Sequence, residues 1–177
     1  MNDLISEVRT RGEFEDGQTF DEFVRWDGVS TSFEEQKRNM IYAQEHKVIG
    51  VRKALLLDSG VEVDVPINDP LNILPDRTGV LVVFGQTPSK FGGHKAPWFF
   101  GFPNNAAIYN ADGSLRFQLD THAGQGSYIG AIHGRVISDN PETLGVLVGT
   151  VGHDPEWLYL VDPSSPKLIP TGKWIRY

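Results

Sequence analysis

The sequence predicts an α+β fold in which short N-terminal helices pack on a large, bent antiparallel β-sheet or sandwich. Helical spacing of apolar residues is confined to the first 46 residues, whereas the rest of the chain alternates apolar and polar residues between turn signals. Glycine follows the same division, because 14 of the 19 glycines lie after residue 78. We therefore expect one domain over residues 1–177, with a helical part at 1–46 and a β-rich part at 47–177.

Three helices are expected in the first part. Thr19 with Glu22, and Ser32 with Glu35, have the capping-box spacing that satisfies free amide groups at a helix start. The expected helices cover residues 3–10, 20–26 and 33–46. The third helix carries apolar residues on one face, which we expect to be buried: Phe33, Met40 and Ile41.

The remainder of the chain predicts nine or ten strands. Pro66 lacks an amide proton, so it is expected to end a strand or to lie on a sheet edge. The segment 79–85 is apolar on both faces, which is typical of a central strand. The other expected strands are two hairpins at 48–57 with 61–67 and 106–110 with 114–119, the segments 98–102, 128–137, 144–151 and 157–161, and a final pair at 167–169 and 173–177.

Composition excludes several classes of function. Without cysteine, the chain has no disulfide, thiolate zinc site, iron–sulfur cluster or cysteine nucleophile. Sixteen basic against 23 acidic residues give a net charge of −7, which opposes nucleic-acid binding. The N-terminus lacks the basic start and apolar run of a signal peptide, and the longest apolar stretch, 80–84, is too short to span a bilayer. We expect a cytoplasmic protein that binds no cofactor, nucleic acid or membrane.

Histidine offers the main candidates for catalysis. His122, His133 and His153 lie in the β-rich part, but their spacings match no metal-ligand motif. The glycine-rich segment 124–130 fits neither the serine-hydrolase elbow nor the dinucleotide fingerprint. We therefore expect no catalytic residue and no metal site. The alternative is a β-rich hydrolase or metal-dependent enzyme that uses these three histidines.

The loop 91–102 concentrates aromatic residues between glycines and prolines. It contains Phe91, Trp98, Phe99, Phe100 and Phe102. One interpretation is a surface anchor for a partner, and the other is a plug that covers the open end of a sheet. A further alternative is a carbohydrate-binding module, whose sugar-stacking residues would be Trp98, Trp157 and Trp174.

The N-terminal segment is the second unusual feature, because residues 1–27 contain eight acids and three bases. Such a segment can steer a basic partner through its electric field. With this acidic front and the turn segment 109–114 (Tyr-Asn-Ala-Asp-Gly-Ser), the chain resembles the immunity proteins of bacterial toxin systems, including contact-dependent growth inhibition. The resemblance implies a non-enzymatic inhibitor that covers the active site of a cognate toxin, commonly a basic nuclease. The expected partner contacts are Glu13, Glu15, Asp16, Asp21, Glu22, Trp26 and Trp98.

Overall fold

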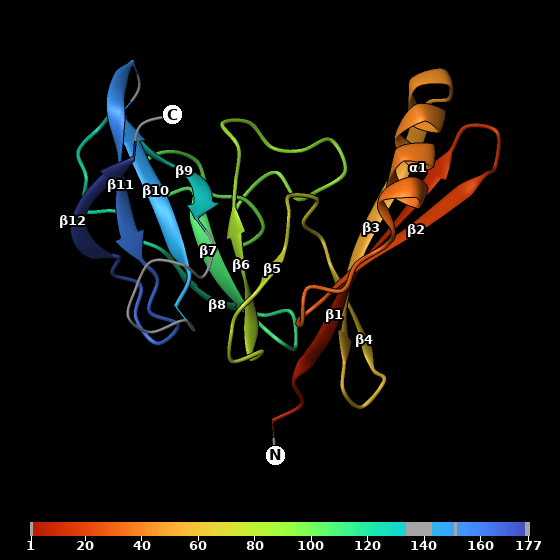
Figure 1. The fold of residues 1–177 in the computed structure, drawn as a ribbon, viewed down its shortest axis with the longest axis horizontal. Coiled ribbons are helices and arrows are strands. Elements are labelled where there is room, and N and C mark those ends of the chain that lie inside the picture. The colour runs from red at the N-terminus through yellow and green to blue at the C-terminus, as the bar shows by residue number, and fades with distance from the viewer. Residues whose placement is uncertain (1, 134–142, 151, 176–177) are drawn as a thin grey trace.

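The computed structural model describes residues 2–133, 143–150 and 152–175. Its strands form three antiparallel sheets of four strands each, in the orders β2-β1-β3-β4, β5-β6-β7-β8 and β12-β11-β10-β9. Figure 1 shows them as three layers, with the second sheet between the other two. We call them the first, middle and third sheets. The expected α+β fold with several packed helices is therefore wrong, because the described chain is mostly β with one helix.

The first sheet replaces two of the expected helices. Its strands are β1 (Ile5–Phe14), β2 (Thr19–Arg25), β3 (Val48–Leu57) and β4 (Glu62–Val65). Segments 3–10 and 20–26 belong to β1 and β2, which pair with Arg11 opposite Asp21. Alternate β1 residues, among them Arg9 and Arg11, lie on the outer face. Arg11 pairs there with Asp21 of β2, and both arginines pair with Glu62 of β4. Because these charged side chains lie among other polar residues, the alternation of apolar and polar residues that is typical of a strand is not visible in β1. The spacing of Thr19 and Glu22 matches a capping box although no helix begins there.

The middle sheet is buried on both faces. It contains β5 (Asn72–Ile73), β6 (Gly79–Val83), β7 (Ala106–Asn110) and β8 (Leu115–Gln118). Val80 and Val82 pack in a core cluster with the first sheet, whereas Leu81, between them, packs in a second cluster with the third sheet. The expected central strand at 79–85 and the hairpin at 106–119 are confirmed, because apolar residues on both faces suit a strand between two layers.

The third sheet contains β9 (Ser127–His133), β10 (Gly145–Thr150), β11 (His153–Leu160) and β12 (Ile169–Ile175). Asn105, which is fully buried, connects this sheet to the middle one. Its amide donates to the carbonyls of Phe84 (2.7 Å) and Ile129 (2.8 Å), and its oxygen accepts from the Ile129 amide (2.8 Å). A single buried side chain thus forms hydrogen bonds with both layers.

Several expected strand boundaries changed. β4 ends immediately before Pro66, as predicted. Segment 98–102 is a loop, because its aromatic side chains pack individually against the core rather than in a ladder. Instead of the two paired strands expected at 167–169 and 173–177, the structure has one strand, β12, which pairs with β11. The predicted strand ends at 134–137, 151 and 176–177 lie outside the described residues.

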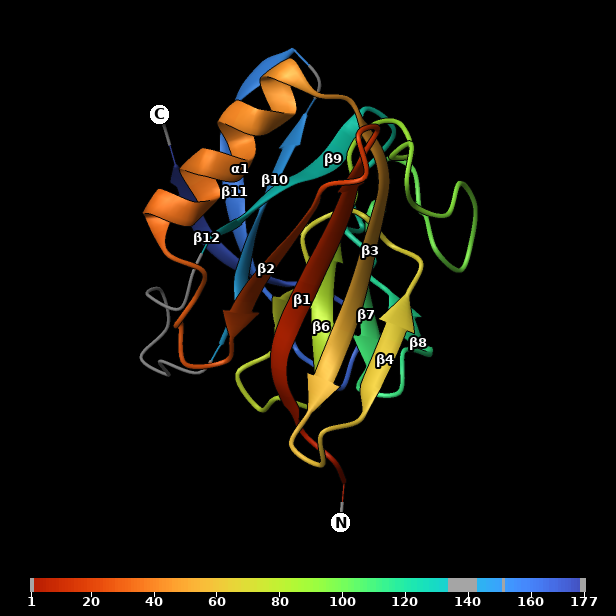
Figure 2. The same ribbon diagram turned by 90° about the vertical axis from the view of Figure 1, so that its right-hand side faces the viewer.

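The helix α1 (Phe33–Glu45) matches the third predicted helix. Its N-cap is Ser32, whose hydroxyl oxygen accepts from the Glu35 amide at 3.3 Å. The expected burial of its apolar face is wrong, because no residue within α1 is buried. No helix in the described ranges is long and apolar enough to span a membrane. Figure 2 shows α1 at one end of the first sheet, beside β2 and β1.

Candidate functional site

Helix α1 is attached to the first sheet by its polar and aromatic side. Asn39 donates to the Glu22 carboxylate on β2 at 3.0 Å, and the Tyr42 hydroxyl donates to Asp16 in the β1–β2 turn. The Tyr42 ring also meets Phe14 edge-on at 4.7 Å. The hydrogen bond with Asp16 raises the pKa of Tyr42 to about 12 and lowers the pKa of Asp16. The helix is therefore held by polar contacts and one aromatic contact.

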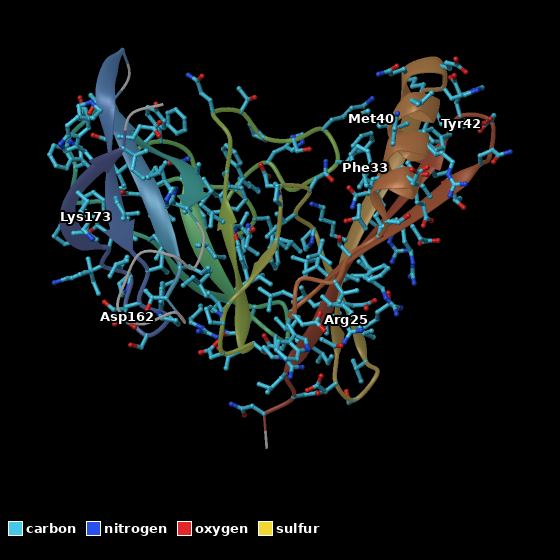
Figure 3. The ribbon with its side chains drawn as sticks, in the orientation of Figure 1. Arg25, Phe33, Met40, Tyr42, Asp162 and Lys173 are labelled. Carbon is cyan, nitrogen blue, oxygen red and sulfur yellow. The ribbon has the colours of Figure 1, made fainter. Side chains whose placement is uncertain are left out.

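The opposite side of α1 is apolar and exposed. At about 100° per residue, Phe33 and Met40 lie about 20° apart, and Tyr42 lies about 180° from Phe33. Phe33 is 76% exposed, Met40 58% and Ile41 45%. Figure 3 shows Phe33 and Met40 on the side of α1 that is turned toward the other two sheets, with Tyr42 on the opposite side. We call Phe33, Met40 and Ile41 the apolar stripe.

A cleft of about 510 Å³ adjoins the stripe. Its walls come from β2 and the following turn, from the inner face of β1 and β3, from the β5 edge of the middle sheet, and from Ile132 and Leu144 of the third layer. Gln36, on the stripe side of α1, lines the cleft together with Val24 and Trp26. Trp26 also carries the Arg77 guanidinium group 4.9 Å above its ring. The cleft therefore reaches the stripe side of α1 at Gln36, and we call the stripe and the cleft together the surface around β2 and α1.

Negative charge concentrates in the same part of the chain. Residues 13–46 contain nine acids and three bases, a net charge of −6 within the total of −7. Glu13 and Asp21 are exposed on the outer face of the first sheet, where Asp21 pairs with Arg11 at 3.1 Å. Glu22 lies on the inner face, and Glu15 accepts from the Lys47 amide at 3.2 Å. The predicted charges are thus divided between two faces, and Asp16 and Glu22 also hold α1 in place.

The two predicted tryptophan anchors have different surroundings. Trp26 is 40% exposed at the cleft. Trp98 is half-buried and stacks on the core residue Tyr109, with 5.7 Å between ring centroids. Phe99 and Phe100 also contact the core, because both rings pack edge-on against buried Phe84. These contacts favour the plug interpretation of the aromatic loop, and Trp98 takes no part in the surface around α1.

No family model, curated protein or solved structure matches this chain. The surface around α1 combines exposed apolar side chains, carboxylates and a cleft. Such a combination suits binding of a cationic surface that has apolar residues of its own. The helical spacing of Phe33, Met40 and Ile41 predicted a buried face, so the exposed stripe was not expected. The residues that could have indicated the exposed stripe lie on the opposite face of α1. There Asn39, Tyr42 and His46 contact β2 and the β1–β2 turn through polar groups.

The three candidate histidines are separated by the strand register. His133 pairs with Gly145 and His153 with Thr150, at opposite ends of β10. Five residues of strand separate those positions by about 17 Å. His122 lies in an exposed loop, 3.3 Å from Asp120. In the ranges that the structure describes, no group of three His, Cys, Asp or Glu residues is arranged to hold a metal ion.

The tryptophans proposed for a carbohydrate-binding module form a pair rather than a row of three. Trp157 and Trp174 are direct neighbours on β11 and β12, 43% and 47% exposed. Trp98 lies in the plug, packed against the core between the first and middle sheets. The three rings therefore do not share one platform.

Proposed function

We propose that this protein is a non-enzymatic inhibitor that binds a basic protein partner, a nuclease toxin by the resemblance to immunity proteins, through the surface around β2 and α1. One coincidence supports the proposal. Six of the twelve large apolar side chains that are exposed in the described chain lie within residues 24–41, inside the segment that carries a net charge of −6. They are Val24, Trp26, Val29, Phe33, Met40 and Ile41.

The physical reasoning has two parts. Carboxylates on the segment 13–46 attract a cationic partner over a range of about 10 Å at moderate salt, which speeds association. The apolar stripe then supplies contact area that is removed from water, and aromatic anchors of this kind dominate the energy of many interfaces. A nuclease presents positive charge where it binds phosphate, so an acidic surface with apolar anchors complements its active site.

The test begins with affinity capture from the source organism at low and high salt. A captured basic protein is purified, and its affinity is measured for the wild type and for the double variant Phe33→Ser/Met40→Ser. Both side chains are more than half exposed, so we expect the variant to fold and to bind at least roughly 30-fold more weakly, the effect of losing one strong anchor. The matched control is Ile169→Ser, on β12, where the isoleucine is 47% exposed.

Function is then tested by adding the protein to a nuclease assay of the captured partner. The proposal expects inhibition at stoichiometric protein, weakened by the double variant and by added salt. Equal inhibition by the wild type and the double variant, or capture of acidic partners only, would refute the proposal.

A further inference from the structure

The cleft beside α1 contains a lysine that the proposed function does not use. Lys53 lies on the inner face of β3, directly opposite Thr10 of β1. Its ammonium group donates to the backbone carbonyl of Asp69 at 2.9 Å, beside the residues of the β5 edge that line the cleft. Burial lowers the pKa of Lys53, and the negative charge of Asp69 opposes this shift.

The other charged groups of the cleft have contacting partners. Arg25 pairs with Asp27 at 3.0 Å, and Glu22 accepts a hydrogen bond from Asn39 at 3.0 Å. Within the described chain, no carboxylate lies within 4.0 Å of the Lys53 ammonium group, which donates to the neutral carbonyl of Asp69. Lys53 is thus a partly desolvated cation that faces the cleft without a contacting anion.

The rest of the lining is mainly apolar. It includes Val8, Val24, Trp26, Leu71 and Ile73. A volume of about 510 Å³ lies within the range of roughly 300–1,000 Å³ typical of small-molecule sites. Such sites combine an apolar lining with a few polar groups that fix the orientation of the ligand.

We propose that this cleft binds a small carboxylate with an apolar body, with the carboxylate on Lys53 and the body between Trp26 and the β5 edge. The anion supplies a contacting countercharge in addition to the charge of Asp69, at a position where water is partly excluded and the attraction is strong. The apolar body replaces water on the apolar lining, to which Leu71, Ile73 and Trp26 contribute. This proposal is independent of the protein partner, because it requires only the isolated chain.

The test uses 2-naphthoate as the probe and its uncharged analogue 2-naphthalenemethanol, titrated into the purified protein and followed by backbone amide NMR. The expected result is saturable binding of naphthoate, with shifts at residues 24–26 and 71–73, and at least about tenfold weaker binding of the alcohol. Lys53→Met keeps the aliphatic stem and removes the charge, so naphthoate should bind at least about tenfold more weakly to this variant.

The matched control is Lys173→Met on β12, which is exposed and distant from the cleft (Figure 3) and should leave naphthoate binding unchanged. A second variant, Val24→Trp, fills the cleft from a position that is 50% exposed and should abolish binding of both probes. Unchanged affinity in Lys53→Met, equal binding of the two probes, or no binding at millimolar naphthoate would each overturn the proposal.

Discussion

Asn105 provides a quantitative test of how the layers are joined. Replacing it with alanine removes three hydrogen bonds of 2.7, 2.8 and 2.8 Å at a position with no exposed surface. The carbonyls of Phe84 and Ile129 and the Ile129 amide then lose these partners. A buried hydrogen bond contributes about 0.5–1.5 kcal/mol net, and an unsatisfied buried group costs about 1–3 kcal/mol.

Three such losses give an expected decrease of about 3 kcal/mol in the free energy of unfolding for Asn105→Ala. For a chain of this length, the same change lowers Tm by about 6–12 °C. Urea denaturation followed by tryptophan fluorescence and near-UV circular dichroism measures the first quantity, and thermal unfolding measures the second.

Two comparisons make this test specific. Gln118→Ala removes one exposed hydrogen bond, to the Asn104 carbonyl at 2.7 Å, and should cost less than about 1 kcal/mol. Asn105→Asp places a carboxylate against two carbonyl oxygens, so its pKa should rise in the folded state. Relative to the wild type, its stability should therefore be higher near pH 4 than at pH 7. A loss in Asn105→Ala no larger than that in Gln118→Ala would refute the assigned role.

Two further predictions concern a core contact and a turn. Trp98→Ala removes the ring that stacks on Tyr109 and should lower the free energy of unfolding by about 3 kcal/mol, measured by urea denaturation. A loss below about 1 kcal/mol would contradict the plug interpretation. Hydrogen bonds from the Ser114 hydroxyl and amide lower the pKa of Asp112 below its usual 3.8, so this contribution to stability is present above pH 3.8 and lost as the pH falls through the lowered pKa. Titration of the Asp112 carboxyl carbon by NMR should show this lowered midpoint, Ser114→Ala should move it toward 3.8, and a midpoint of 3.8 in the wild type would count against the assignment.

The strands that the sequence predicted correctly are those whose own residues indicate burial on both faces or a hairpin turn. Residues 79–83 are apolar on both faces because they lie between two layers, and residues 106–118 have the turn chemistry of a hairpin. β1 and β2 lack such a signal. Their inner face includes Gly12, where an added Cβ would lie 1.9 Å from the Phe20 ring, so a glycine occupies a position where alternation calls for an apolar residue. Their outer face is balanced by cross-strand ion pairs that only the register shows.

The candidate site was predicted in part. Net charge and local acid content depend on composition alone, so the acidic segment was visible in the sequence. The exposure of the apolar stripe was not, because a helical apolar face ordinarily packs inward. The stripe is exposed because the other side of α1 carries Asn39 and Tyr42, which contact Glu22 and Asp16. Glu22 lies on β2, in a segment that the local spacing predicted as a helix. Lys53 became a candidate only when the register placed it on the inner face of β3.

The absence of buried residues in α1 affects how the protein can diversify. Since the side chains of its apolar stripe are exposed, substitutions there would change the proposed binding surface at little cost in stability. If the binding partner changed during evolution, those side chains could be exchanged one at a time while the three sheets keep their structure.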